Sequence, residues 1–277
     1  MLVLKRVVGD YGGLHMNLGL EGKRAIVTGG SRGIGRCCAR ALAQEGTRVC
    51  IVARTQSELN QVLEEISEMG GEGFAIAVDL TSQKSCQQVV RETVETFGGV
   101  DILVNNVGAA KNADILELSA KCIDDALRLK SYSYLRMAQL VIPYMKVSQW
   151  GRIINIAGGA GTSPSRRNIP TGAANVTILN MTRALSDAVS VDGILVNAIC
   201  PGLTNTVRAR TQQNARAVFE NRDVEELLQE LECKLPAGRM AEPEEIANVV
   251  AFLASETCSY MFGSSIYMDG GARRGTP

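Results

Sequence analysis

Short apolar runs alternate with longer helical patterns from residue 23 onward, and this alternation limits the possible folds most. Buried strands are predicted at 24–27, 48–53, 74–78, 102–104, 152–156, 195–199 and 265–268. Helices are predicted at 33–45, 57–69, 82–97, 124–145, 171–189 and 243–254. Short apolar strands joined by helices are typical of a parallel sheet with both faces covered. The sequence therefore predicts one α/β domain with a doubly wound, mostly parallel, seven-stranded sheet.

Two segments lie outside this alternation. Residues 1–19 match no element of the pattern, so we expect an N-terminal extension followed by one domain over 20–277. Segment 206–235 is polar and helix-prone, and it follows the carboxyl end of a predicted strand, where ligands bind in open α/β sheets. We expect this segment to be a lid over the substrate. A surface insertion without a role at the site is the alternative.

Composition excludes several classes of function. Lys+Arg and Asp+Glu both total 29, so no basic surplus favours nucleic acid or an anionic membrane as partner. No apolar run approaches the ~18 residues of a membrane span. Eight cysteines without a CxxC pair predict free thiols in a reducing cytoplasm and no metal site. The single histidine, His15, lies in the extension, which argues against Ser-His-Asp and Cys-His catalysis.

The sequence Thr-Gly-Gly-Ser-Arg-Gly-Ile-Gly at 28–35 joins the first predicted strand to the first helix. Glycines allow a tight turn and a close approach of the backbone to a pyrophosphate. The helix N-terminus then offers unpaired N–H groups to the phosphates. Because strand, loop and helix occur together, this segment predicts a dinucleotide-binding turn.

The same segment resembles the Thr-Gly-x-x-x-Gly-x-Gly motif of the short-chain dehydrogenase/reductase family, whose members have a Rossmann fold. Further motifs that resemble this family follow in order, and the resemblance spans residues 21–273. It implies a cofactor site made of Gly29, Ser31, Arg32, Gly33, Ile34, Gly35, Asp79, Leu80, Asn106, Gly108, Asn175, Pro201, Gly202 and Thr206.

The end of the second strand favours NADP(H) over NAD(H). NAD-specific proteins place an acid there to bind the ribose 2′-OH, whereas this chain has Ala53 followed by Arg54. With no carboxylate to repel a 2′-phosphate, Arg54 and Arg32 are expected to bind it by charge-assisted hydrogen bonds. The alternative is that both arginines are solvated surface charges.

The family normally carries Asn, Ser, Tyr and Lys at its catalytic positions. Counting from neighbouring motifs places Lys130, Gly158, Thr171 and Asn175 at these positions. A threonine hydroxyl is a much weaker acid than a tyrosine phenol, and a neutral Asn supplies no positive field. With these four positions changed, the sequence resembles a branch of the family whose members are similar to β-ketoacyl-carrier-protein reductases but lack Tyr-x-x-x-Lys.

Lys130 and Asn175 look like an exchange of Lys and Asn between two neighbouring helices. We hypothesise that Lys130 occupies the volume of the usual lysine and acts as general acid or stabilises an oxyanion. A structural lysine paired with Asp124 or Asp125 is the alternative. Tyr134 shares the helix face of Lys130 and is expected to serve packing. Other polar candidates, expected either to bind a substrate anion or to be solvated, are Ser163, Ser165, Arg166 and Arg167.

These observations predict an NADP(H)-dependent oxidoreductase that reduces the carbonyl of an acyl thioester or a small keto compound. A cofactor-binding subunit or sensor without activity, and a lyase-type reaction that uses Lys130, are the alternatives. Helices 124–145 and 171–189 resemble those at family interfaces, which predicts a homotetramer or homodimer.

Overall fold

Seven parallel strands form one sheet in the order β3-β2-β1-β4-β5-β6-β7. The computed structural model describes residues 17–110, 113–166 and 168–274, so most of the predicted extension 1–19 lies outside the described residues. The strands are β1 (Arg24–Thr28), β2 (Arg48–Ala53), β3 (Gly73–Ala77), β4 (Ile102–Asn105), β5 (Gly151–Ile156), β6 (Ile194–Pro201) and β7 (Ser265–Met268). The predicted parallel, seven-stranded α/β sheet is thus confirmed.

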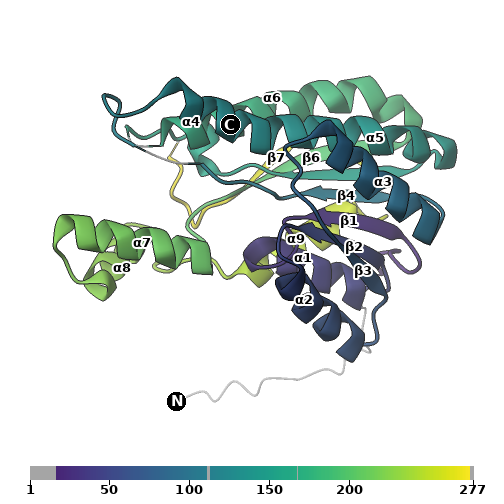
Figure 1. Ribbon diagram of the computed structural model, residues 1–277, viewed down its shortest axis with the longest axis horizontal. Coiled ribbons are helices and arrows are strands. Elements are labelled where there is room, and N and C mark those ends of the chain that lie inside the picture. The colour runs from purple at the N-terminus through teal and green to yellow at the C-terminus, as the bar shows by residue number, and fades with distance from the viewer. Residues whose placement is uncertain (1–16, 111–112, 167, 275–277) are drawn as a thin grey trace, which may run out of the picture.

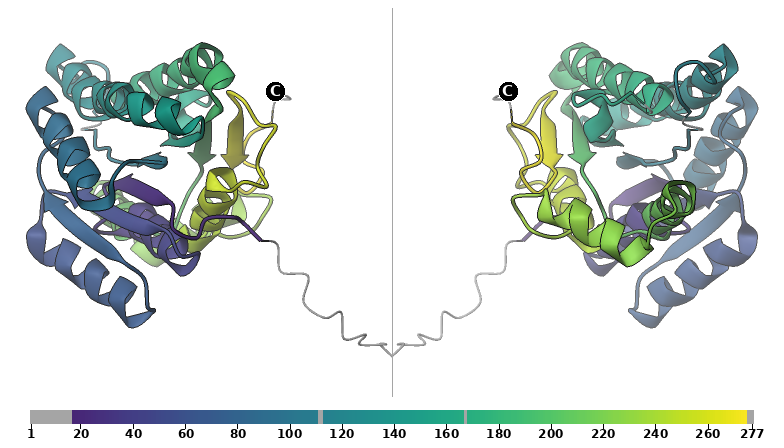
Figure 2. Two further views of the ribbon diagram at one scale, coloured as in Figure 1. Left: turned by 90° about the vertical axis from the view of Figure 1, so that its right-hand side faces the viewer. Right: turned by 90° about the vertical axis from the view of Figure 1, so that its left-hand side faces the viewer.

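Helices cover both faces of this sheet, with α1, α2 and α9 on one face and α3, α5 and α6 on the other (Figures 1 and 2). The α-helices are α1 (Gly33–Gln44), α2 (Gln56–Glu68), α3 (Gln83–Phe97), α4 (Ala120–Ala126), α5 (Ser133–Ser148), α6 (Ile169–Val189), α7 (Val207–Glu220), α8 (Val224–Cys233) and α9 (Pro243–Ala254). None of the described helices is both long enough and apolar enough to cross a lipid bilayer.

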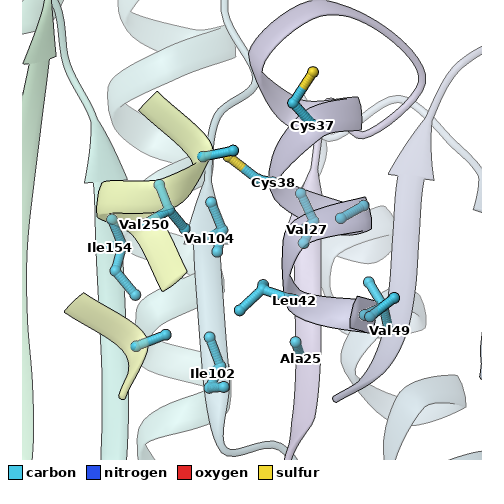
Figure 3. Packing of buried hydrophobic residues seen from close by; sticks show 14 of the residues in the cluster. Ala25, Val27, Cys37, Cys38, Leu42, Val49, Ile102, Val104, Ile154 and Val250 are labelled. Atoms are coloured by element: carbon cyan, nitrogen blue, oxygen red, sulfur yellow. The ribbon is translucent and has the colours of Figure 1, made fainter. Parts of the chain in front are cut away.

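Residues of β1 alternate between the two hydrophobic cores, because successive side chains of a strand point to opposite faces. Ala25 and Val27 pack with Leu42 of α1 and Val250 of α9, as Figure 3 shows, while Ile26 belongs to the core beneath α3 and α5. All of these side chains are fully buried, which explains why the strands read as continuous apolar runs.

The helix predicted at 124–145 is longer and less regular than expected. It begins at Ala120 and reaches Ser148, and one π-helical segment at Leu127–Tyr132 lies between α4 and α5. Such π turns frequently occur at functional sites. Lys130 lies within this segment.

Segment 206–235 contains α7 and α8, which extend away from the sheet-and-helix body (Figure 1). The first turn of α7 lies near the carboxyl ends of the strands. Strand order reverses between β1 and β4, so the carboxyl ends of these two strands mark the topological switch point where ligands bind in open α/β sheets.

Candidate active site

A cleft of about 510 Å³ lies at the carboxyl ends of β1, β2 and β4. Most of the residues predicted to hold the cofactor line it: Gly29, Ser31, Arg32, Gly33, Ile34, Arg54, Asp79, Leu80, Asn106, Gly108 and Thr206. Four of the predicted residues do not line the cleft. Pro201 is the last residue of β6 and Gly202 follows it, while Gly35 and Asn175 are buried.

Three glycines set the shape of the loop between β1 and α1. Gly29 and Gly33 have φ of 65° and 54°, where residues with a Cβ are strained. A Cβ on Gly35 would overlap the Gly29 carbonyl oxygen and the Asn106 amide. The Asn106 Nδ2 donates to the carbonyl oxygens of Thr28 and Gly29 at 3.2 and 3.1 Å, so Asn106 holds the loop in place.

The N-terminus of α1 suits an anion. Its N-cap residue, Arg32, places no side-chain cap on the first N–H groups, and the first turn contains no acid. Unpaired N–H groups and the positive end of the helix dipole therefore face the cleft. This is the arrangement that a dinucleotide pyrophosphate requires.

The far end of the cleft carries both basic groups and an acid. Arg32 and Arg54 line it as predicted, and the end of β2 has no carboxylate. Glu58, in the first turn of α2, nevertheless brings a carboxylate into the same cleft. Its Oε2 accepts a hydrogen bond from Ser31 at 2.9 Å and lies 3.4 Å from Arg32 Nε. The expectation that nothing there repels a 2′-phosphate was therefore wrong. The first turn of α2 places the Glu58 carboxylate against the loop between β1 and α1.

Lys130 and Asn175 meet between the π-helical segment and α6. Lys130 Nζ donates to Asn175 Oδ1 at 2.6 Å and to the Ala157 carbonyl oxygen at 2.5 Å. Asp125, one of the acids considered as a partner for Lys130, instead pairs with Lys121 at 3.0 Å. Within the described ranges, no carboxylate forms an ion pair with Lys130.

Burial, aided by the nearby positive charge of Arg208, lowers the pKa of Lys130 to about 7. The cause is mainly desolvation, because an ammonium removed from water loses its hydration and gains no anion here. An amine with a pKa near neutrality exchanges a proton readily at physiological pH.

Two glycines make room for this pair. A Cβ on Gly108 would lie 3.0 Å from Cδ of Lys130, so Gly108 allows the lysine stem to pass. Gly158 has φ of 137°, and a Cβ there would lie 2.8 Å from Nδ2 of Asn175. The position where the family resemblance predicts a serine therefore cannot hold a side chain while Asn175 keeps this place.

A second, smaller cavity of about 40 Å³ lies beside Lys130. Its lining consists of Gly108, Ala109, Ala110, Ala126, Lys130, Thr171, Ala174 and Arg208. Gly108, Ala109 and Arg208 also line the large cleft. Thr171 thus shares a cavity with Lys130, whereas Gly158 and Asn175 do not line it.

Sequence reasoning missed Arg208, which lies in the first turn of α7 and donates from Nη1 to the Gly108 carbonyl oxygen. Tyr134 is buried, and its hydroxyl donates to the Ile156 carbonyl oxygen at 3.0 Å, which confirms the packing interpretation. Ser163, Ser165 and Arg166 are exposed and line neither cavity, and Arg167 lies outside the described residues. The described part of the chain has no cluster of three or more metal-ligating side chains.

Comparison with known proteins agrees with this geometry. A family model described as Enoyl-(Acyl carrier protein) reductase matches residues 29–273. The chain is 32% identical to the 3-oxoacyl-(acyl-carrier-protein) reductase of Vibrio cholerae over 256 residues, which cover 92% of this chain and 98% of that one. It is 30% identical to the 7alpha-hydroxysteroid dehydrogenase of Bacteroides fragilis, with coverages of 91% and 94%.

Solved structures show the same likeness. L-sorbose reductase from Gluconobacter frateurii, solved with NADPH and L-sorbose, matches with a TM-score of 0.90 and 30% identity, covering 94% of this chain and all of that one. The parallel sheet, the glycine loop, the cleft at the switch point and these relatives lead to one conclusion. The chain is an oxidoreductase of the short-chain dehydrogenase/reductase family, in its ketoreductase-like branch.

Proposed function

We propose that this protein is an NADP(H)-dependent carbonyl reductase in which Lys130 replaces the usual tyrosine as proton donor. The observation that carries this proposal is the placement of Lys130, whose Nζ is fixed by Asn175 and Ala157 beside a cavity that adjoins the cofactor cleft. Its pKa of about 7 suits a general acid at neutral pH.

Residues of the large cleft fit the cofactor. The uncapped start of α1 and the glycine loop would hold the pyrophosphate, and Arg32 and Arg54 would hold a 2′-phosphate. NADPH in the solved structure of L-sorbose reductase supports the choice of NADP(H). When bound, NADPH would supply the hydride that reduces the carbonyl carbon, and it would leave as NADP⁺.

Lys130 Nζ donates to two acceptor oxygens, an arrangement that both the neutral amine and the ammonium can satisfy. A neutral amine has two N–H groups, which match the two acceptors, Ala157 O and Asn175 Oδ1. An ammonium has a third N–H, which is then available to a substrate oxygen in the small cavity. Donation of this third proton to the carbonyl oxygen gives the alcohol and returns Lys130 to the neutral form that Asn175 and Ala157 hold.

Membership of the family supports a substrate with a reducible carbonyl group. Both a small keto compound and an acyl thioester carry the carbonyl that this chemistry needs. The relative from Vibrio cholerae, a 3-oxoacyl-(acyl-carrier-protein) reductase, supports the thioester. We also infer that segment 206–235 covers the substrate, because the first turn of α7 lines both cavities.

The test is the consumption of NADPH with a panel of ketones, keto acids and thioesters, comparing wild type with Lys130→Met. We expect turnover to fall by about 10²–10⁴-fold in the variant, the usual contribution of a general acid, while NADPH binding measured by fluorescence persists. The matched control is Lys121→Met, since Lys121 is exposed and pairs with Asp125. Full turnover by Lys130→Met would refute the catalytic role, and tight NADPH binding without turnover of any carbonyl would favour the cofactor-binding alternative.

A further inference from the structure

Arg208 is a cation without an anionic partner among the described residues. It donates a hydrogen bond to the Gly108 carbonyl oxygen, and no carboxylate within those residues forms an ion pair with it. Arg208 is exposed overall, although desolvation by the surrounding protein lowers the pKa of its guanidinium. A guanidinium without a carboxylate partner is available to an anionic ligand.

Two further features oppose a cation at this place. Arg208 lies in the first turn of α7, at the positive end of the helix dipole, and that turn contains no acid. Arg208 also lies close enough to Lys130 to lower the pKa of the lysine. Arg208 and Lys130 therefore line one small cavity, and an anion there would offset the repulsion between the two cations.

The cavity between these two cations has the size and lining for one small anionic group. Besides Lys130 and Arg208, it is lined by Thr171 and by glycine and alanine residues, with no acid among them. A cavity needs about 10–15 Å³ to hold one water, so about 40 Å³ has room for roughly three non-hydrogen atoms. A carboxylate has three, and a guanidinium binds it in a bidentate manner.

We propose that the substrate is an oxo acid with a free carboxylate, and that Arg208 binds this carboxylate while Lys130 faces the adjacent carbonyl oxygen. This inference rests on the proposed function and narrows its substrate class, in preference to an acyl thioester. It makes Arg208 a specificity-determining residue on the first turn of the proposed lid.

A cofactor phosphate is the other anion to consider for Arg208. The N-terminus of α1 and the glycine loop already provide a pyrophosphate site at Gly29 and Gly33. Arg208 is instead held by Gly108, the glycine against which the Lys130 stem packs, and it lines the cavity of Lys130. Arg208 also lines the large cleft, but its contact with Gly108 and its place in the smaller cavity assign its charge to the proton-donating side of the site.

The experiment compares matched substrates that differ only in the carboxylate. Acetoacetate, methyl acetoacetate and the N-acetylcysteamine thioester of acetoacetate are reduced with NADPH, and pyruvate is paired with methyl pyruvate. In wild type we expect kcat/KM for each acid to exceed that of its neutral partner by about tenfold or more, the value of one charge-assisted pair. In Arg208→Gln we expect this preference to vanish, and in Arg208→Lys to return in part.

Binding provides a readout independent of turnover. Calorimetry with oxamate, a non-reducible analogue of pyruvate, should give at least about tenfold weaker binding to Arg208→Gln than to wild type. The control is Arg210→Gln, since Arg210 lies two residues further along α7, lines neither cavity and hydrogen-bonds to Asn205. This control should keep both the acid preference and the oxamate affinity.

Each other outcome has a distinct meaning. Equal reduction of acids and neutral partners overturns the carboxylate site but leaves the proposed reductase intact. If Arg208→Gln weakens NADPH binding and leaves the acid preference unchanged, the partner of Arg208 is the cofactor and the inference is wrong. If no carbonyl is reduced but oxamate binds through Arg208, the reductase function fails while the anion site stands.

Discussion

Lys130 and Asn175 are joined across two helices by a hydrogen bond of 2.6 Å from Nζ to Oδ1. The bond fixes the lysine amine at the edge of a small cavity and leaves no carboxylate beside it within the described residues. This pairing gives the site its electrostatic character, because a buried amine held by neutral oxygens loses its proton far more easily than a solvated one.

The first prediction concerns the pH profile of carbonyl reduction. A general acid must be protonated in the free enzyme, and the pKa of Lys130 is about 7. The value of kcat/KM for reduction should therefore be constant at low pH and fall as pH rises through about 7. Oxidation of the product alcohol needs the neutral amine and should show the opposite trend. Both profiles are measured with wild type, and a reduction profile that is flat from pH 6 to about pH 9 would contradict the role of Lys130.

The second prediction concerns stability. Because the folded-state pKa of Lys130 is lowered from 10.5 to about 7, the unfolded chain binds more protons between these values. The free energy of unfolding should rise with pH in this window by about 1.4 kcal/mol per unit from this one group. Urea unfolding of wild type and Lys130→Met from pH 7.5 to about pH 9.5 isolates this slope, since other groups titrate alike in both. Parallel stability curves for the two proteins would show that Lys130 is solvated.

The third prediction concerns Gly158. Alanine at this position meets both an unfavourable φ of 137° and the amide of Asn175. The matched control is Gly70→Ala, since Gly70 has φ of 79° and no atom within 4 Å of a built Cβ. We expect Gly158→Ala to lose about 1–3 kcal/mol more unfolding free energy than Gly70→Ala, and Asn175→Ser to recover part of this difference. Equal losses of unfolding free energy in the two alanine variants would show that Asn175 does not hinder a side chain at position 158.

The fourth prediction concerns Glu58. Its carboxylate contacts Ser31 and Arg32, where a 2′-phosphate would bind, so the two anions compete. Glu58→Gln should therefore tighten NADPH binding by about three- to tenfold and change NADH binding little. Fluorescence titration of both cofactors measures this, with Glu64→Gln, on the exposed side of α2, as control. An equal change in the affinities for NADPH and NADH would show that the 2′-phosphate does not bind beside Glu58.

The fifth prediction concerns assembly. Tyr144 and Val147 are one turn apart on α5, and Val147 is 88% exposed. We propose that a second copy of the chain covers this apolar surface in a homodimer or homotetramer. Light scattering should show a multiple of the 29.7 kDa chain mass for wild type and a smaller mass for Val147→Glu. A wild-type monomer would refute this.

The fold could be predicted from the sequence because the strands are apolar runs, and those in the middle of the sheet, such as β4 and β5, are buried on both faces. Bounds of α9 agree with the prediction at both ends, since Pro243 begins the helix and its apolar pattern continues to Ala254. The cofactor loop could be predicted for a similar reason, because strand, glycines and helix are local in the chain.

The remaining parts of the site depend on three-dimensional proximity. The π-helical segment around Lys130 has no distinct residue pattern, and it lies against α6, which is distant in the chain. Glu58 and Arg208 lie in the first turns of α2 and α7, and only the position of those helices at the cleft shows that the two residues line it. Spacing along the chain correctly placed Lys130 and Asn175 on neighbouring helices but could not give the direction of their side chains.

Gly158 has a consequence for how this site changes over time. A side chain at position 158 requires the Asn175 amide to leave the place where it holds Lys130, so the effect of a change at 158 depends on the residue at 175. A serine at 158 costs less stability once residue 175 is smaller, and that second change releases the lysine. Glycine and asparagine thus form an epistatic pair, and a return to a serine-bearing site is easiest through two coupled substitutions.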